Sequence, residues 1–78
     1  MVVQAYILVQ TAVGKANEVA NAISHISGVT LAEDVTGPYD VIVRAEASSM
    51  DELGQMVVAR VQQVAGITRT VTCPVVHF

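Results

Sequence analysis

The sequence predicts an α+β fold in which strands and helices follow each other in the order βαββαβ. Two observations carry this prediction. The 78 residues suffice for one domain only, so residues 1–78 are expected to form a single domain. The two halves of the chain also match: residues 26–30 (Ile-Ser-Gly-Val-Thr) correspond to residues 64–68 (Val-Ala-Gly-Ile-Thr) at an offset of 38. Such a repeat indicates two copies of one strand–helix–strand unit, each too small to bury its own apolar face.

The first half predicts a strand, a helix and a second strand. Residues 2–10 alternate between apolar and more polar positions, as a half-buried strand does. Apolar residues recur at helical spacing over residues 15–27, and Gly28 is typical of the position that follows a helix. Residues 29–36 form the second predicted strand, and a Gly-Pro turn at 37–38 ends it. The core-facing side of the first strand is predicted to carry Val3, Ala5, Ile7 and Val9.

The second half repeats this order. Residues 39–47 alternate as a strand, and residues 67–77 form the last predicted strand. Between them, Ser49 followed three residues later by Glu52 is a capping box that begins a helix, and Gly66 ends it. The core-facing side of the third strand is predicted to carry Tyr39, Val41, Val43 and Ala45. The apolar stripe of the second helix is predicted to consist of Leu53, Met56, Val57, Val61 and Val64.

This order of elements is that of the ferredoxin-like plait, whose antiparallel sheet has the strand order 4-1-3-2. The second and fourth strands are then the edges of the sheet. Pro74 fits an edge because it has no N–H to donate to a neighbouring strand. Glu33 and Asp34 fit the other edge, where charge discourages aggregation.

The composition predicts that the chain associates with itself. Apolar residues make up 53% of the chain and charged residues only 14%, against about 25% in an average soluble domain. In the predicted fold the helices cover one face of the sheet. The other face carries Tyr6, Leu8 and Ile42, which water should not contact. We expect a homo-oligomer, at least a dimer, with these three residues in the dimer interface.

Charge and hydropathy exclude several classes of function. The net charge is −3, and the four basic residues are scattered, so direct binding of nucleic acid by this chain is not expected. No apolar run approaches the 18 to 20 residues, roughly, that a membrane span needs. The first residues lack the pattern of a signal peptide, which predicts a cytoplasmic protein.

The residues most often used in catalysis are few. One cysteine, Cys73, and two distant histidines, His25 and His77, do not have the spacing of a metal site. Neither histidine has an acid or thiol beside it, so no catalytic set can be assembled. We therefore predict no catalytic residue, no metal and no cofactor.

The turn after the second strand is chemically richer. Residues 36–40 (Thr-Gly-Pro-Tyr-Asp) combine a flexible backbone, an aromatic ring and a carboxylate. Backbone N–H groups of a turn can receive a carboxylate, Asp40 can pair with an ammonium, and Tyr39 can wall off a side chain. This set fits a small zwitterion. It also fits an ordinary Gly-Pro turn with a solvated aspartate.

Taken as a whole, the chain resembles the C-terminal effector domain, or RAM domain, of the Lrp/AsnC family of transcriptional regulators. The more specific matches are the Gly-x-Tyr-Asp hairpin at 37–40 and the Gly-Ile-x-Arg-Thr-x-Thr stretch at 66–72. Residues 13–16 (Val-Gly-Lys-Ala) and 27–29 (Ser-Gly-Val) also match. Together these stretches span nearly the whole chain.

The resemblance implies a dimer with the sheets of two subunits face to face, and further assembly, commonly into tetramers of dimers. It implies that a small effector, typically an amino acid, binds between dimers near the hairpin. Gly37, Tyr39 and Asp40 would then lie in or near the effector pocket, with Thr70 and Thr72 as weaker assignments. Family regulators also have an N-terminal helix-turn-helix domain. This sequence begins at its first strand, so we expect it to act through a partner, such as a full-length regulator of the family.

The expected function is a regulatory, non-enzymatic module that binds an amino acid or a related metabolite. Two alternatives remain open. Small dimeric plaits also serve as cofactor-free monooxygenases or isomerases, which need polar groups in the cleft between helices and sheet. ACT-like domains bind amino acids on the same plait, usually at the turn after the first strand, here residues 11–14.

Overall fold

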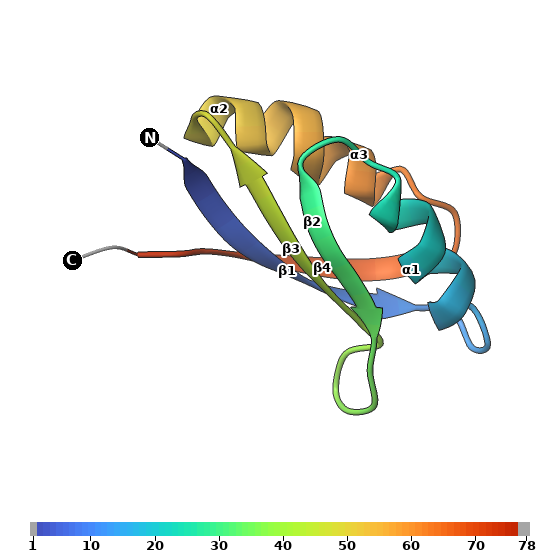
Figure 1. Ribbon diagram of the computed structural model, residues 1–78. Coiled ribbons are helices and arrows are strands. Elements are labelled where there is room, and N and C mark those ends of the chain that lie inside the picture. The colour runs from blue at the N-terminus through green and yellow to red at the C-terminus, as the bar shows by residue number, and fades with distance from the viewer. Residues whose placement is uncertain (1, 77–78) are drawn as a thin grey trace.

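A four-stranded antiparallel sheet with helices packed on one face makes up the structure, a computed structural model that describes residues 2–76 (Figure 1). The elements are β1 (Val3–Thr11), α1 (Ala16–Ser24), β2 (Val29–Asp34), β3 (Val41–Ala47), α2 (Met50–Glu52), η1 (Leu53–Val58), α3 (Ala59–Gln62) and β4 (Ile67–Pro74). The strand order is β2-β3-β1-β4, which confirms the predicted ferredoxin-like order 4-1-3-2. Both edges of the sheet, β2 and β4, are the predicted ones.

The core is apolar and lies between the sheet and the helices. The inward residues of β1 and β3 alternate as predicted, because successive strand residues point to opposite faces. Every buried side chain among residues 2–76 is hydrophobic. The buried set is Ala5, Ile7, Val9, Val19, Ala20, Ile23, Val41, Val43, Ala45, Leu53, Val57 and Val61.

The two halves of the chain pack on each other as equivalent units. Gly28 and Gly66, which correspond at the offset of 38, have φ angles of +95° and +97°. A Cβ atom added to Gly28 would meet Val57 of the second helix, and one added to Gly66 would meet Val19 of the first. Val19 and Val57 also correspond at that offset, so the contacts are reciprocal. The sequence repeat is therefore a repeat of structure.

Several boundaries differ from the predicted ones. α1 ends at Ser24, three residues early, because the N–H groups of His25 and Ile26 bond to carbonyl groups three residues back, in a tighter turn that leads to Gly28. β2 ends at residue 34 and β3 begins at residue 41, so the hairpin between them is longer than predicted. β4 ends at Pro74, and His77, the predicted end of that strand, lies outside the described residues.

The second helix begins as predicted but winds differently. The Ser49 hydroxyl accepts a hydrogen bond from the Glu52 N–H at 3.1 Å, which confirms the N-cap, whereas the Glu52 carboxylate bonds to the Ser48 hydroxyl. The helical run continues from residue 50 to 62, and its middle part, η1, is a π-helix. This wider winding places Leu53, Val57 and Val61 in the core. Met56, expected on the same stripe, is 47% exposed instead.

Candidate functional site

A cavity of about 360 Å³ lies beside the β2–β3 hairpin, on the side of the sheet that the helices leave open. Figure 1 shows this hairpin extending beyond the sheet, away from the helices. Apolar side chains make up most of the cavity wall. Its lining residues are Leu8, Val35, Thr36, Gly37, Pro38, Tyr39 and Ile42. The structure thus brings two predicted site residues, Gly37 and Tyr39, together with two predicted interface residues, Leu8 and Ile42.

Tyr39 lies in the hairpin and not in a strand. The sequence pattern predicted that Tyr39 would begin the third strand and face the helices with Val41. Because β3 begins at Val41, Tyr39 precedes the strand and does not follow its alternation. It is half-buried and lines the cavity together with Leu8 and Ile42, which belong to the open face. Its ring is therefore available as a wall of a binding site.

Asp40 fixes the hairpin to the end of β1 through two hydrogen bonds and closes the hairpin itself through a third. Its Oδ2 atom accepts from the Thr11 N–H at 2.8 Å, and its own N–H donates to the Val9 carbonyl at 2.9 Å. Its carbonyl accepts from the Val35 N–H at 2.8 Å. Asp40 is half-buried, so it is not the freely solvated aspartate of the alternative interpretation. Its second carboxylate oxygen has no hydrogen-bond partner within residues 2–76.

The hairpin presents free backbone donors. The N–H groups of Thr36, Gly37 and Tyr39 donate to no acceptor within residues 2–76, while the Gln10 amide holds the Pro38 carbonyl at 3.0 Å. Gly37 has a φ angle of +150°, and a Cβ atom there would meet no heavy atom within 4 Å. Free N–H groups on a turn can receive an anion such as a carboxylate.

The turn at residues 11–14 offers fewer such donors. The Thr11 N–H bonds to Asp40, the Ala12 N–H donates to the Gly66 carbonyl at 2.8 Å, and the Lys15 N–H donates to the Ala12 carbonyl at 3.0 Å. Val13 at the tip of this turn is fully exposed. Within residues 2–76, only the N–H groups of Val13 and Gly14 remain free in this turn, and the exposure of Val13 leaves the turn without an apolar wall.

Thr70 and Thr72 lie on the other face of the sheet. They pair with Val9 and Ile7 of β1, whose side chains face the helices. The Thr70 hydroxyl accepts a hydrogen bond from the Gln62 amide of α3 at 3.3 Å. Within one chain, the structure does not bring these two threonines to the hairpin cavity.

The open sheet face carries the three predicted interface residues. Leu8 pairs with Ile42, and Tyr6 pairs with Arg44, in the register of β1 and β3. Tyr6 is 42% exposed, and Leu8 and Ile42 are half-buried. The sequence pattern missed Arg44, which occupies the same face and whose Nε atom is buried without a hydrogen-bond partner in the part of the chain that the structure describes. A single arginine within an alternating strand does not indicate from the sequence that part of its side chain will be buried.

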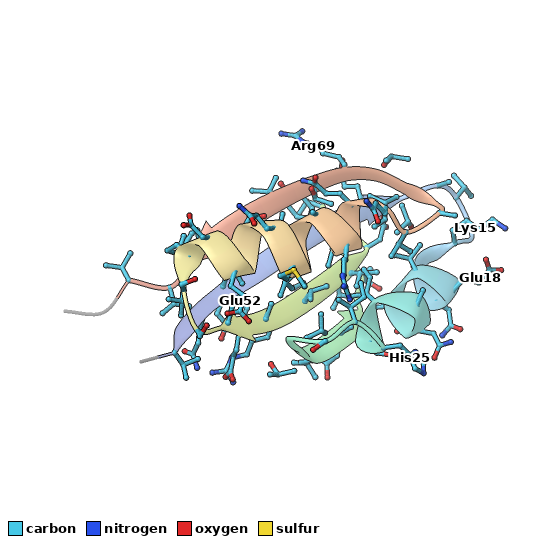
Figure 2. The ribbon with its side chains drawn as sticks, turned by 90° about the horizontal axis from the view of Figure 1, so that it is seen from above. Lys15, Glu18, His25, Glu52 and Arg69 are labelled. Carbon is cyan, nitrogen blue, oxygen red and sulfur yellow. The ribbon has the colours of Figure 1, made fainter. Side chains whose placement is uncertain are left out.

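In the part of the chain that the structure describes, the histidine and the cysteine are both exposed. His25 is exposed at the end of α1, and its Nδ1 atom lies 2.8 Å from the Asn21 carbonyl oxygen (Figure 2). Cys73 is exposed on β4. Among the described residues, no group of three His, Cys, Asp or Glu side chains could hold a metal ion. None of the helices within residues 2–76 combines the length and apolar character that crossing a bilayer requires.

Comparison with known proteins identifies related chains. Among curated proteins, the HTH-type transcriptional regulator PH1916 of Pyrococcus horikoshii is 34% identical over 55 residues, which cover 70% of this chain and 37% of that protein. The chain thus spans 37% of the length of the curated relatives that it matches. Those relatives are named as helix-turn-helix regulators.

Solved structures agree with this comparison. The hypothetical protein PHS023 from P. horikoshii superimposes with a TM-score of 0.86 at 32% identity, covering 100% of this chain and 93% of that chain. E. coli AsnC has the same fold, with a TM-score of 0.86 at 21% identity over 97% of this chain and 52% of that chain. Residues 4–77 match the family described as the Lrp/AsnC ligand binding domain. The chain therefore belongs to the Lrp/AsnC ligand-binding domain family.

Proposed function

We propose that this chain is an effector-binding regulatory module that binds an amino acid with an apolar side chain in the hairpin cavity. The observations that carry the proposal are the apolar walls of the cavity, the free backbone N–H groups of the hairpin, and the Asp40 carboxylate, which follows the lining residue Tyr39 in the chain but is not itself one of the lining residues. These three kinds of group match the side chain, the carboxylate and the ammonium of an amino acid.

Each part of the ligand has a counterpart in the hairpin. The ligand carboxylate would accept hydrogen bonds from the N–H groups of Thr36, Gly37 and Tyr39. The ammonium would pair with the carboxylate oxygen of Asp40 that Thr11 leaves free. The side chain would pack against the apolar wall formed by Leu8, Val35, Pro38, Tyr39 and Ile42. Burial of that side chain supplies the hydrophobic part of the affinity.

A regulatory role is favoured over an enzymatic one. A small plait enzyme needs polar groups in the layer between sheet and helices. In residues 2–76 every buried side chain of that layer is apolar. The curated relatives, moreover, are named as transcriptional regulators.

The hairpin is favoured over the turn that ACT-like domains use. Three of the N–H groups at residues 11–15 already bond within the chain, and that turn has no apolar wall. The hairpin has both free donors and a cavity. The ACT-like alternative would be favoured again if a ligand were found at residues 11–14.

The module would act as a homo-oligomer in the cytoplasm. Two copies would pack their open sheet faces together through Tyr6, Leu8 and Ile42, and dimers would assemble further into tetramers of dimers. Thr70 and Thr72 would reach an effector only from a neighbouring dimer, since they lie on the opposite face of their own sheet. The signal would pass through a full-length regulator of the same family, and the chain itself would not contact DNA.

A thermal-shift screen against the twenty amino acids tests the proposal. A ligand that binds only the native state at one hundred times its Kd stabilises that state by about 2.7 kcal/mol. We expect apolar amino acids to raise the melting temperature and charged ones to leave it unchanged. Tyr39→Ala, which removes a cavity wall, should abolish the shift, whereas Val13→Ala at the other turn should preserve it. Stabilisation that survives Tyr39→Ala and is lost in Val13→Ala would move the site to residues 11–14.

A further inference from the structure

Arg44 occupies an unusual place on the open sheet face. It lies near the middle of β3, opposite Tyr6 in β1 and Leu31 in β2. Both neighbours are large apolar residues that remain more than 40% exposed. The Arg44 Nε atom is buried and has no hydrogen-bond partner among residues 2–76. A buried donor without an acceptor costs free energy, and nearly all such groups in folded proteins find a partner.

The charges of this face are balanced. Arg44 and Arg69 lie on it together with Glu33 and Glu46, as the strand register shows, because paired residues share a face. A surface with two positive and two negative groups does not suit a polyanion, since nucleic acid binds where basic residues are clustered. It does suit a second copy of the same face. In a two-fold interface both copies use the same surface, so a contact between a basic residue of one copy and an acidic residue of the other occurs twice.

The two acids differ in the partners that their side chains already have. The Glu46 carboxylate accepts a hydrogen bond from the Gln4 amide at 3.0 Å, within the same chain. Glu33 is exposed on the edge strand β2, and its side chain makes no hydrogen bond or ion pair within residues 2–76. Its partner in β3 is Ile42, two residues from Arg44 and on the same face.

We propose that Arg44 of one copy pairs with Glu33 of a second copy, and that the two symmetric ion pairs set the register of the dimer. In this dimer the apolar residues of the face supply the buried surface area. The two ion pairs favour one relative orientation of the two faces over the others. This inference rests on the proposed self-association through the open sheet face, and it adds the residues that make the association specific. Ion pairs that are desolvated on association contribute specificity in this way.

Charge reversal in two separate chains tests the pairing. Arg44→Glu alone places two acids against each other twice in the dimer, and Glu33→Arg alone does the same with two bases. Each variant should weaken the dimer by about thirtyfold or more, as expected when a partner of a buried charge pair is lost. A mixture of the two variants restores both pairs at once, so it should form heterodimers with near-original affinity. Analytical ultracentrifugation with one of the two variants fluorescently labelled measures the dissociation constant of the heterodimer.

The control variant is Arg60→Glu, the same change at an exposed arginine of α3 on the helical side. It should leave the dimer Kd unchanged. Circular dichroism of each variant verifies the fold. Because Glu33 is exposed at a sheet edge, the Glu33→Arg variant should fold and test the pairing even if Arg44→Glu unfolds. If the original chain sediments as a monomer of 8.2 kDa, the proposed self-association is wrong. If the original is a dimer but the mixed variants form no heterodimer, the Arg44–Glu33 pairing is wrong while self-association stands.

Discussion

The carboxylate of Asp40 accepts a hydrogen bond from the backbone N–H of Thr11 at 2.8 Å. The two residues are far apart in sequence, and the bond joins the β2–β3 hairpin to the end of β1. It also joins the two turns at which a ligand site was considered. Asp40 thus has a structural role, in joining the hairpin to β1, and a proposed role in binding the effector. Substitutions of Asp40 must distinguish an effect on stability from an effect on binding.

Asp40→Ala and Asp40→Asn are expected to differ. Alanine removes the acceptor of a part-buried N–H, so it should lower the free energy of unfolding by about 1–3 kcal/mol as well as weaken ligand binding. Asparagine keeps an acceptor for Thr11 but lacks the charge, so it should fold normally. It should still lose about tenfold to a hundredfold in affinity, the range for a hydrogen bond to a charged group. Denaturant unfolding and calorimetric titration measure the two effects, and unchanged binding by Asp40→Asn contradicts the ammonium pairing.

Gly28→Ala is expected to be the most harmful of three glycine substitutions. At a φ of +95° a side chain is strained, and its Cβ would lie 2.6 Å from Cγ2 of Val57 and 3.0 Å from the Glu46 carbonyl oxygen. Strain alone costs about 1–3 kcal/mol, and the collision with backbone adds to it. In Gly66→Ala the Cβ would lie 3.1 Å from the Val19 methyl and 3.4 Å from Cβ of Lys15, both side-chain atoms, so this substitution should cost less. Gly37→Ala meets open space and should cost least; equal unfolding free energies for the three would contradict this order.

Features that depend on neighbours in sequence could be predicted. The alternation of β1 placed Ala5, Ile7 and Val9 in the core because a strand has a period of two. The correspondence of Gly28 with Gly66 gave the two-unit architecture because both glycines end equivalent helices with a positive φ. Ser49 was identified as an N-cap from its own local pattern.

Features that depend on tertiary contacts could not. No pattern in the sequence predicts the π-helical winding of residues 53–58, within which Met56 is exposed to solvent. Tyr39 was assigned to a strand because it alternates with Val41 in the sequence. The strand begins only at Val41, after the hairpin bonds of Asp40, so Tyr39 lies in the hairpin instead. The bonding of Asp40 to Thr11 and the unpartnered Nε of Arg44 arise only when distant strands are adjacent.

Ser49→Ala should destabilise the start of the second helix. The Ser49 hydroxyl accepts the Glu52 N–H, which otherwise has no partner at a helix N-terminus. Loss of such a cap lowers the free energy of unfolding by about 1 kcal/mol. Ser48→Ala, which removes only an exposed contact to the Glu52 carboxylate, should cost less. Thermal unfolding of both variants measures the two losses of stability. An equal loss in both would mean that the Ser49 cap does not stabilise the helix more than the exposed Ser48 contact does.

The 78-residue chain should not bind duplex DNA by itself at physiological salt. Its net charge is −3, and its four basic residues do not cluster. Figure 2 shows Lys15 beside Glu18, and the Lys15 ammonium lies 3.7 Å from the Glu18 carboxylate, which offsets its charge. Binding through phosphate contacts requires several neighbouring cations. A gel shift at micromolar protein that weakens with added salt would contradict this expectation.

Tyr6→Asp and Leu8→Asp should separate self-association from ligand binding. Both residues lie on the open face, but only Leu8 also lines the hairpin cavity. An aspartate at either position is buried without a partner when two faces meet, so both variants should dissociate in light scattering. Tyr6→Asp leaves the cavity wall intact and should still bind an apolar amino acid, if more weakly, whereas Leu8→Asp should not bind it. If Tyr6→Asp remains an oligomer of the original size, the open face is not the interface. If it dissociates and loses all binding, the cavity needs the second copy to be complete, which would place the effector between subunits.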